Sequence, residues 1–355
     1  MAARSNDPPG LHATLGRMIR LYLERTKEPM PTKRPQRTPI VFVLLFLGAL
    51  PAQGQYFKQS SYWKTHRQEL TLGLGISNFL GELGGRDRVG SDFVWDLEFS
   101  QTRPATSFGY RYYVARKHSF RLNFSYGILA GNDNLTREPF RSNRNLHFKS
   151  DVLELALLYE LHLYREELGH VYDLRGVKGT KASRIGIYFF GGIGGLHFQP
   201  KALFNNTWVA LQPLRTEGQG LLNGPEEYNT LGICIPMGLG VRKAFNRQLS
   251  GGIELQYTKT FTDYIDDVSG FYYDKEVIRG VSGDIGAYLA DPSLGTLSLP
   301  HLEGLNPTAT GEQRGDPDDL DAYLFLKAHL HYKLYKYRSG SKKYRARIRR
   351  QKIVF

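Results

Sequence analysis

Two groups of carboxylates have the residue types and spacing that come closest to a chemical site. One lies in residues 263–267 and the other in residues 316–321, and together they comprise Asp263, Asp266, Asp267, Asp316, Asp318, Asp319 and Asp321. Clustered carboxylates can bind Ca²⁺ through their oxygens, but this spacing does not match the EF-hand loop. We therefore expect these side chains to form turn caps and hydrogen bonds within loops, and we predict no metal and no cofactor.

Histidine, serine and cysteine are the other residue types here that could do chemistry. His329 and His331 would share one face of a strand; no third metal ligand is evident, so we expect them to hydrogen bond in a polar interior. No serine has the neighbours that a Ser-His-acid hydrolase needs. Cys234 is the single cysteine and is expected to pack as a small apolar side chain. The sequence thus predicts no catalytic residue. A lipid-modifying enzyme is a third function class, and the missing nucleophile is evidence against it.

The elements that would position these residues are eight segments in which apolar and polar residues alternate. The clearest places Phe120, Leu122 and Phe124 against Arg121 and Asn123. The eight segments are 69–76, 107–114, 120–128, 151–163, 185–194, 231–241, 249–257 and 321–335. Period-two alternation predicts strands with one apolar face, and about 9–11 tilted residues can cross a bilayer. A soluble β-sandwich has the same alternation, so the pattern alone leaves both open.

Three features favour the membrane barrel over the sandwich. The number of strands is even and sufficient to close a barrel, an export signal precedes them, and their polar faces combine glycine with both signs of charge. The charged residues on these faces are Glu69, Arg111, Arg121, Glu154, Glu160, Arg242, Glu254 and Lys327. We predict an all-β fold, an eight-stranded antiparallel transmembrane β-barrel with long surface loops. A barrel of eight strands has room only for side chains inside, so we expect a plugged interior.

The lengths of the connections test this topology independently. The links 115–119 and 242–248 are short, and the links 77–106, 129–150, 195–230 and 258–320 are long. Short and long links alternate, as expected for periplasmic turns and surface loops. Only the link 164–184 departs from the pattern, because it is long on the predicted periplasmic side. Both termini are then periplasmic.

The N-terminal residues 1–54 have the layout of an export signal. Residues 40–50 are an unbroken apolar run of 11, three basic residues precede it, and the small residues Ala52 and Gly54 follow. This is the pattern of a secretory signal, and the run is short for a transmembrane helix, although an N-terminal membrane anchor is the alternative. Met30 would give a charged region of ordinary length and is an alternative start. We predict an outer-membrane location.

The net charge of +13 comes from the two ends of the chain. Residues 1–54 contain 8 basic and 3 acidic residues, and residues 336–355 contain 9 basic and none acidic, which leaves 30 basic and 31 acidic residues in 55–335. The pI of 9.6 is therefore weak support for nucleic-acid binding. We assign 55–67 as a periplasmic segment, 68–335 as the barrel and 336–355 as a basic periplasmic tail.

The basic tail has two interpretations. Blocks of like charge usually stay solvated until a partner neutralises them, so one interpretation is a disordered tail and the other is electrostatic docking on an acidic periplasmic surface. The candidate docking residues are Lys342, Lys343, Arg345, Arg347, Arg349 and Arg350.

Two loop segments, 208–220 and 261–269 with Tyr272 following, resemble the signature loops of a family of Bacteroidota outer-membrane barrels that includes PorG of the type IX secretion system. The signature residues are Thr216, Glu217, Gly218, Gln219, Gly220, Asp263, Tyr264, Asp266 and Asp267. The likeness extends to 78–82, 111–113, 131–133, 148–154, 191–194, 200–202, 235–238 and 314–323.

The resemblance implies a non-enzymatic barrel that associates with the outer-membrane lipid and with a periplasmic PorK–PorN ring. The alternative is a stand-alone structural or adhesion barrel of the OmpX kind. Glycines 218 and 220 of the first signature loop can adopt positive φ at little cost, so we expect a tight turn there.

Overall fold

The structure is a computed structural model of the whole chain, and it describes residues 62–83, 99–135, 138–166, 185–246, 248–295 and 306–334. All of these belong to one compact unit that spans 52–355. The predicted export signal and the basic tail lie outside the described residues.

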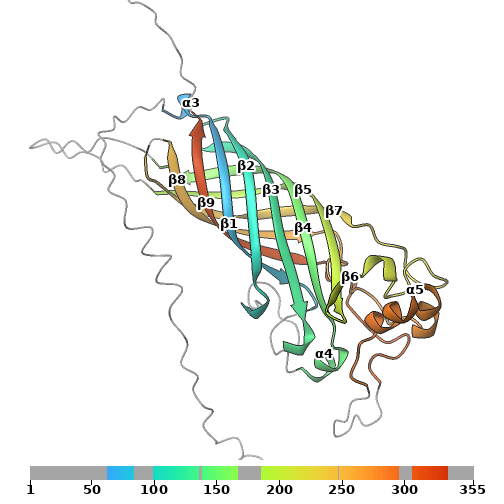
Figure 1. The fold of residues 1–355 in the computed structure, drawn as a ribbon. Coiled ribbons are helices and arrows are strands. Elements are labelled where there is room, and N and C mark those ends of the chain that lie inside the picture. The colour runs from blue at the N-terminus through green and yellow to red at the C-terminus, as the bar shows by residue number, and fades with distance from the viewer. Residues whose placement is uncertain are drawn as a thin grey trace, which may run out of the picture. The chain divides into compact units, whose positions relative to one another are not determined.

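Eight strands close into one antiparallel barrel (Figure 1). They are β1 (Gln68–Leu80), β2 (Arg103–Tyr113), β3 (His118–Asn132), β4 (His147–Tyr164), β5 (Ile185–Phe204), β7 (Leu231–Ala244), β8 (Leu249–Thr260) and β9 (Ala322–Leu334). Each pairs with its neighbour along the chain, and the pairing of β1 with β9 closes the ring. The predicted fold and its eight strands are confirmed.

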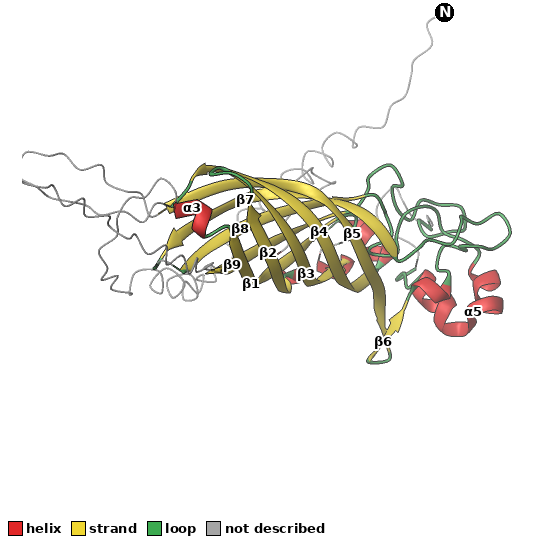
Figure 2. Ribbon diagram, turned by 90° about the horizontal axis from the view of Figure 1, so that it is seen from above, coloured by secondary structure: helices red, strands yellow, loops and turns green. Residues whose placement is uncertain are grey.

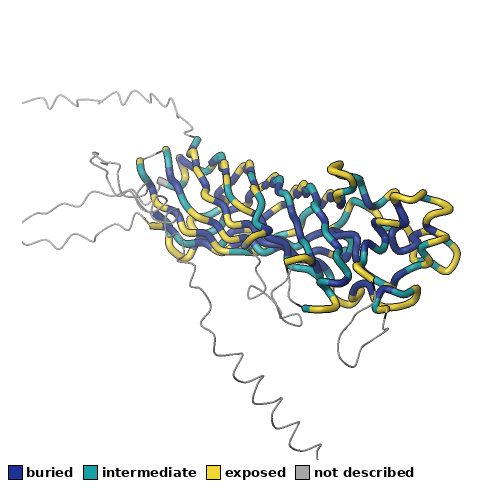
Figure 3. The backbone as a smooth tube through the Cα atoms, turned by 60° about the horizontal axis from the view of Figure 1, so that its bottom comes forward, coloured by how far each residue is buried: buried dark blue, intermediate teal, exposed yellow. Residues whose placement is uncertain are grey.

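Along most of each strand, residues alternate between the outside of the barrel and its lumen, as the mixed colours along the strands in Figure 3 show. On β3, Phe124 is 45% exposed while its neighbours Asn123 and Ser125 are buried. In the β3–β4 register, Phe124 lies opposite Leu155 and Ser125 lies opposite Glu154. Apolar side chains therefore cover the outside and polar side chains fill the inside, which is the reverse of a soluble barrel.

The two ends of the barrel differ (Figure 2). At the end that carries α3 (Tyr62–Thr65), two short turns join β2 to β3 and β7 to β8. At the other end the long loops carry β6 (Thr207–Ala210), α4 (Pro139–Arg144), α5 (Lys275–Ala290) and the 3-10 turns Phe99–Gln101, Asp133–Leu135 and Gln212–Leu214. We call the described loops at this end, residues 81–83, 133–135, 138–146, 205–230, 261–295 and 306–321, the cap. Short turns are periplasmic in outer-membrane barrels, so the cap faces the cell surface.

The structure extends several strands and adds elements that alternation did not predict. Strand β5 runs ten residues beyond its predicted end at 194 and forms a hairpin with β6. Helix α5 lies in the last long loop and is kinked at Gly283. None of the described helices combines the length and apolar composition needed to cross a membrane.

The core has a polar part inside the barrel and an apolar part at the mouth below the cap. The apolar cluster joins barrel residues such as Phe148, Phe198 and Phe325 to the cap residues Ile265 and Val268. Cys234 belongs to this cluster and is fully buried, which confirms its predicted packing role.

Candidate functional site

Arg111 is at the centre of an ion-pair network in the lumen. Its guanidinium lies 2.5 Å from a carboxylate oxygen of Glu69 and 2.5 Å from one of Glu160. Arg121 extends the network from Glu160, at 2.9 Å, to Glu254, at 2.8 Å. All of these side chains are fully buried, so solvent does not screen the pairs.

The charges of the lumen network are balanced. Among the lumen residues that the structure describes, five carboxylates face five cations: Glu69, Glu154, Glu160, Glu166 and Glu254 with Arg111, Arg121, Arg242, Lys327 and Lys333. Strand β5 contributes the hydroxyl of Tyr188, which donates to Glu254 over 2.8 Å. Buried charges are tolerated only when they are paired and hydrogen bonded, and here strands from the whole circumference supply the partners.

Glu166 comes from the link 164–184, whose length broke the predicted pattern of turns. Its carboxylate accepts hydrogen bonds from Arg242 Nε at 2.6 Å and from Lys333 Nζ at 2.7 Å. The start of this link thus folds back over the periplasmic mouth of the lumen. All eight charged residues predicted to face the lumen are buried, whereas sequence reasoning missed Glu166.

Ser119 and His162 make a contact that superficially resembles a hydrolase site. Ser119 Oγ lies 2.8 Å from His162 Nε2, and Glu160 accepts from Ser119 over 2.6 Å. In a catalytic triad the carboxylate orients the other ring nitrogen of the histidine. Glu160 instead lies on the Nε2 side, 3.5 Å away, and is engaged by two arginines, so this cluster is part of the lumen packing.

His329 and His331 both point into the lumen, as predicted, with their rings stacked at a centroid distance of 5.7 Å. His331 Nδ1 lies 3.2 Å from Glu69 and His329 Nε2 lies 3.6 Å from Glu254. Within the described part of the chain, no group of three or more His, Cys, Asp or Glu side chains is placed to hold a metal ion.

Glu217 is the centre of a second buried cluster, which holds the cap together. Its carboxylate accepts from the backbone N–H of Ser269 at 2.9 Å and of Gly270 at 3.2 Å, and Arg314 Nη1 donates to it over 2.8 Å. The same Arg314 nitrogen also donates to the carbonyl of Asp267 over 2.6 Å. We call Glu217, Asp267 and Arg314 the cap hub; it joins three stretches of loop that are distant in sequence.

Asp267 completes the hub from the second signature loop. Its two carboxylate oxygens accept from Thr216 Oγ1 and from Tyr228 Oη, each at 2.5 Å. Tyr228 stacks on Tyr264 with ring centroids 4.4 Å apart. The two predicted signature loops therefore meet at one place.

The first signature loop forms the predicted tight turn. Gly218 has a φ of +72° and Gly220 a φ of +71°. A Cβ on Gly218 would lie 2.4 Å from the ring of Tyr273, so both conformation and space require glycine there. Gln219 closes the turn by accepting from the backbone N–H of Glu217 over 3.1 Å.

The cap contains a group of carboxyls, one of them the hub residue Asp267, that are buried or partly buried. Burial raises the pKa of Glu82 to about 7, of Asp263 to about 8 and of Asp267 to about 6, the last in spite of the nearby Arg314. Burial, with repulsion from the neighbouring Asp263 and Glu82, also raises the pKa of Asp266 and Asp321 well above the usual value. Folding therefore shifts these carboxyls toward the protonated form relative to the unfolded chain.

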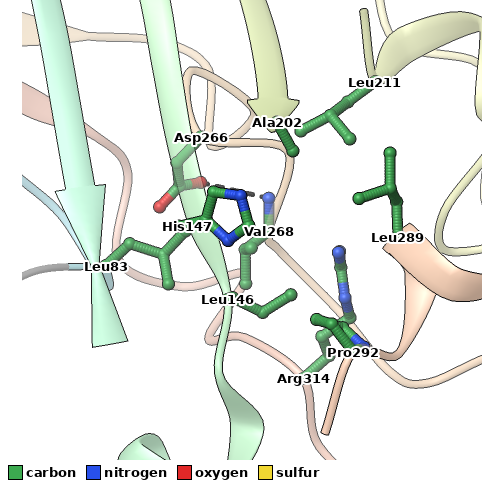
Figure 4. A pocket seen from close by; sticks show the side chains of 10 residues that line it. All are labelled: Leu83, Leu146, His147, Ala202, Leu211, Asp266, Val268, Leu289, Pro292 and Arg314. Carbon is green, nitrogen blue, oxygen red and sulfur yellow. Dashed lines mark hydrogen bonds between the residues drawn. The ribbon is translucent and has the colours of Figure 1, made fainter. Parts of the chain in front are cut away.

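The cavity beside the hub is small (Figure 4). Its polar lining comes from His147, Asp266 and Arg314, and the rest is apolar. Its volume of about 10 Å³ is room for about one water molecule. The cavity therefore does not accommodate an organic substrate.

We expect Glu217→Gln to loosen the cap and leave the barrel intact. The variant keeps the shape of the side chain but removes the charge that faces Arg314, and a hydrogen bond to a charged group contributes about 1.5–3 kcal/mol. Limited proteolysis of the purified barrel should cut the cap at least about tenfold faster, since each factor of ten is about 1.4 kcal/mol. Glu227→Gln, at a half-exposed ion pair with Arg215, is the matched control and should change little. An unchanged cutting rate in Glu217→Gln would contradict the role of the hub.

We expect the cap to lose stability as the pH rises. The folded-state pKa values of Glu82, Asp263 and Asp267 lie above those of the unfolded chain, about 4. Their stabilising contribution is complete below about pH 4 and is lost as the pH rises through about 6 to 8. Cap amide exchange, corrected for intrinsic rates, should be at least about tenfold faster at pH 9 than at pH 5. Asp263→Asn should flatten this dependence, and a pH-independent exchange rate would refute the interpretation.

The predicted site residues fall into two groups, of which the structure describes one. All nine signature residues lie in the cap, where those of 216–220 meet those of 263–267. The six basic residues of the tail lie outside the described residues. Arg314 and Gly315, the start of an Arg-Gly-Asp tripeptide, are buried, so this tripeptide is not presented for adhesion. The part that Arg314 has in the hub was not predicted.

The apolar outside, the polar plugged lumen and the closed ring of strands define a transmembrane β-barrel of the outer-membrane class. The chain belongs to the family described as Domain of unknown function (DUF6089), whose model matches residues 56–279. No curated protein matches the sequence.

Several solved outer-membrane proteins are similar in structure. Neisserial surface protein A is 7% identical, with a TM-score of 0.32 over 75% of this chain and 97% of its own. OprG from Pseudomonas aeruginosa is 9% identical, with a TM-score of 0.32 over 81% of this chain and 100% of its own. Ail, the attachment invasion locus protein of Yersinia pestis, is 6% identical, with a TM-score of 0.30 over 75% and 99%.

Proposed function

We propose that the protein is a non-enzymatic outer-membrane barrel of the stand-alone structural or adhesion kind, in which the cap is the working surface. The main support is the balanced lumen network. Its charged side chains are almost completely buried and pair with one another, so side chains fill the lumen. The carboxylates of the cap hub are likewise occupied by backbone amides, hydroxyls and Arg314.

The outer surface of the cap supports an adhesive role. Leu222 is 84% exposed, Leu294 71% and Phe271 60%. The cap loops thus expose three large apolar side chains, and apolar side chains that gather on a surface commonly mark interaction sites. The hub holds the loops that carry Leu222 and Phe271, since Glu217 lies five positions before Leu222 and Gly270, whose N–H it accepts, lies one position before Phe271.

Adhesion is tested with cells that display the full-length protein. Replacing Leu222, Phe271 and Leu294 with serine should reduce cell attachment to host or abiotic surfaces while heat-modifiable gel migration stays normal. The matched control replaces the lipid-facing Leu326, 43% exposed on β9, with alanine and should leave attachment unchanged. Equal attachment by the triple variant and the parent would contradict the proposal.

A second candidate is a PorG-like component of the type IX secretion system. It is favoured by the resemblance of 208–220 and 261–269, because the residues of these segments make the hub rather than lie scattered over the loops. In this candidate the periplasmic side contacts the PorK–PorN ring. Affinity purification in mild detergent should then recover PorK- and PorN-like proteins, and deletion of 339–355 should weaken their retention most at low salt, where charge contacts are not screened. Recovery of the barrel without these proteins would contradict this candidate and support the stand-alone barrel.

A further inference from the structure

Two lysines lie directly opposite each other on the outside of the barrel. Lys149 on β4 and Lys201 on β5 are register partners in the antiparallel ladder. Side chains at such positions have Cβ atoms about 5 Å apart, and like charges there are destabilising. A pair of this kind needs negative charge close by.

Among the described residues, Asp151 supplies part of that charge. Lys201 Nζ lies 2.8 Å from Asp151 Oδ2, and Tyr126 Oη donates to Asp151 Oδ1 over 3.0 Å. Lys149 Nζ instead lies 5.4 Å from the centre of the Trp208 ring. One carboxylate thus faces two ammonium groups, and the cluster of Lys149, Lys201 and Asp151 has a net charge of +1.

The position of this cluster identifies the medium that it meets. On β4 the outward residues Leu153, Leu155 and Leu157 are exposed and apolar, and Asp151 and Lys149 follow them toward the cap. The cluster therefore borders the lipid-facing band at the cell-surface end. Tyr126 and Trp208 flank it, and such aromatic residues are enriched where acyl chains meet head groups.

We propose that Lys149 and Lys201 bind a phosphate group on the head group of an outer-leaflet lipid. Ammonium groups bind phosphate by charge-assisted hydrogen bonds, and a phosphate between the two lysines would supply the missing negative charge. The site is continuous with the surface that already faces lipid, so the acyl chains of the same molecule would lie along the leucines of β4. This site is independent of the proposed adhesive surface of the cap.

The test uses the full-length barrel in neutral detergent and measures bound lipid by native mass spectrometry. The probes are a phosphorylated lipid A-type glycolipid and the same glycolipid without its phosphates. We expect the parent to prefer the phosphorylated form and Lys149→Gln/Lys201→Gln to bind it at least about tenfold more weakly, corresponding to about 1.4 kcal/mol. Asp151→Asn removes the competing carboxylate and should bind it more tightly.

Lys243→Gln is the matched control, because Lys243 is an exposed residue of β7 at the opposite end of the barrel. It should bind the phosphorylated lipid as the parent does. The proposal is overturned by equal binding of the two glycolipids, by an equal loss in Lys243→Gln, or by a tighter complex in the double variant. Displacement of the lipid by an equal concentration of inorganic phosphate would assign the site to the free anion. Asp151→Asn keeps both lysines and serves as the test if the double variant does not fold. Tighter binding of the phosphorylated lipid by Asp151→Asn then supports the proposal, and unchanged or weaker binding overturns it.

Discussion

Replacing Arg111 with methionine is expected to lower the free energy of unfolding of the barrel by about 3–5 kcal/mol, the usual cost of removing one partner from a buried ion pair. Glu69 and Glu160 would lose the guanidinium between them, and the lumen would carry an uncompensated negative charge. The measurement is the midpoint of urea unfolding in detergent micelles, followed by heat-modifiable gel migration.

The double variant Arg111→Met/Glu160→Gln separates charge balance from lost packing. It restores equal numbers of positive and negative charges in the lumen, and Arg121 keeps Glu254 as its partner at 2.8 Å. We expect the double variant to regain at least half of the lost stability. If it is less stable than Arg111→Met, the shape of the network outweighs its charge balance and our explanation is wrong.

Phe124→Arg on the outside of β3 is expected to cost about 2–4 kcal/mol, the range for arginine near the middle of the bilayer. Phe124 is 45% exposed in the structure, so in water this change would cost little. The penalty arises only if the surface faces hydrocarbon. Unfolding from lipid vesicles measures it, and a cost below 0.5 kcal/mol would refute the position of the membrane.

Two further variants bracket this result. His118→Arg lies on the same strand at its periplasmic end, where the cost of arginine falls to about 0–1 kcal/mol. Ser125→Arg is adjacent to Phe124 but faces the lumen, where Ser125 is fully buried near Lys327 at 3.3 Å. It should destabilise through crowding and repulsion in any solvent.

The strands could be predicted from the sequence because each carries its own period-two pattern and needs no knowledge of its partners. Phe120–Phe124 shows this, since five residues are enough to distinguish the apolar outward face from the polar inward face. The ends were less accessible: the outward positions of β5 beyond Gly194 include His197, Gln199 and Lys201, so the apolar pattern stops while the strand continues.

The cap could not be predicted in the same way, because its contacts join residues that no local pattern links. Glu217 and Ser269 are 52 positions apart, and Glu82 and Asp316 are 234 apart. Helix α5 contains glycines at 280, 283 and 286, which weaken its helical signal. Glu166 carries no signal at all, since its role depends on where a long link folds back. The resemblance indicated which loops matter, but not that Arg314 joins them.

The balanced lumen network also has a consequence for how the barrel is made. Glu69 near the start of β1 finds its partners on β2, β7 and β9, and Arg242 on β7 is 173 positions away in the chain. In a partly paired sheet these charges would enter the membrane without partners, at a cost of several kcal/mol each. Neutralisation and ring closure therefore have to occur together, and contacts of such separation form slowly. The unpaired charges of an incomplete sheet oppose its insertion into the bilayer. We therefore expect the lumen charges to favour insertion of closed barrels over partly paired sheets.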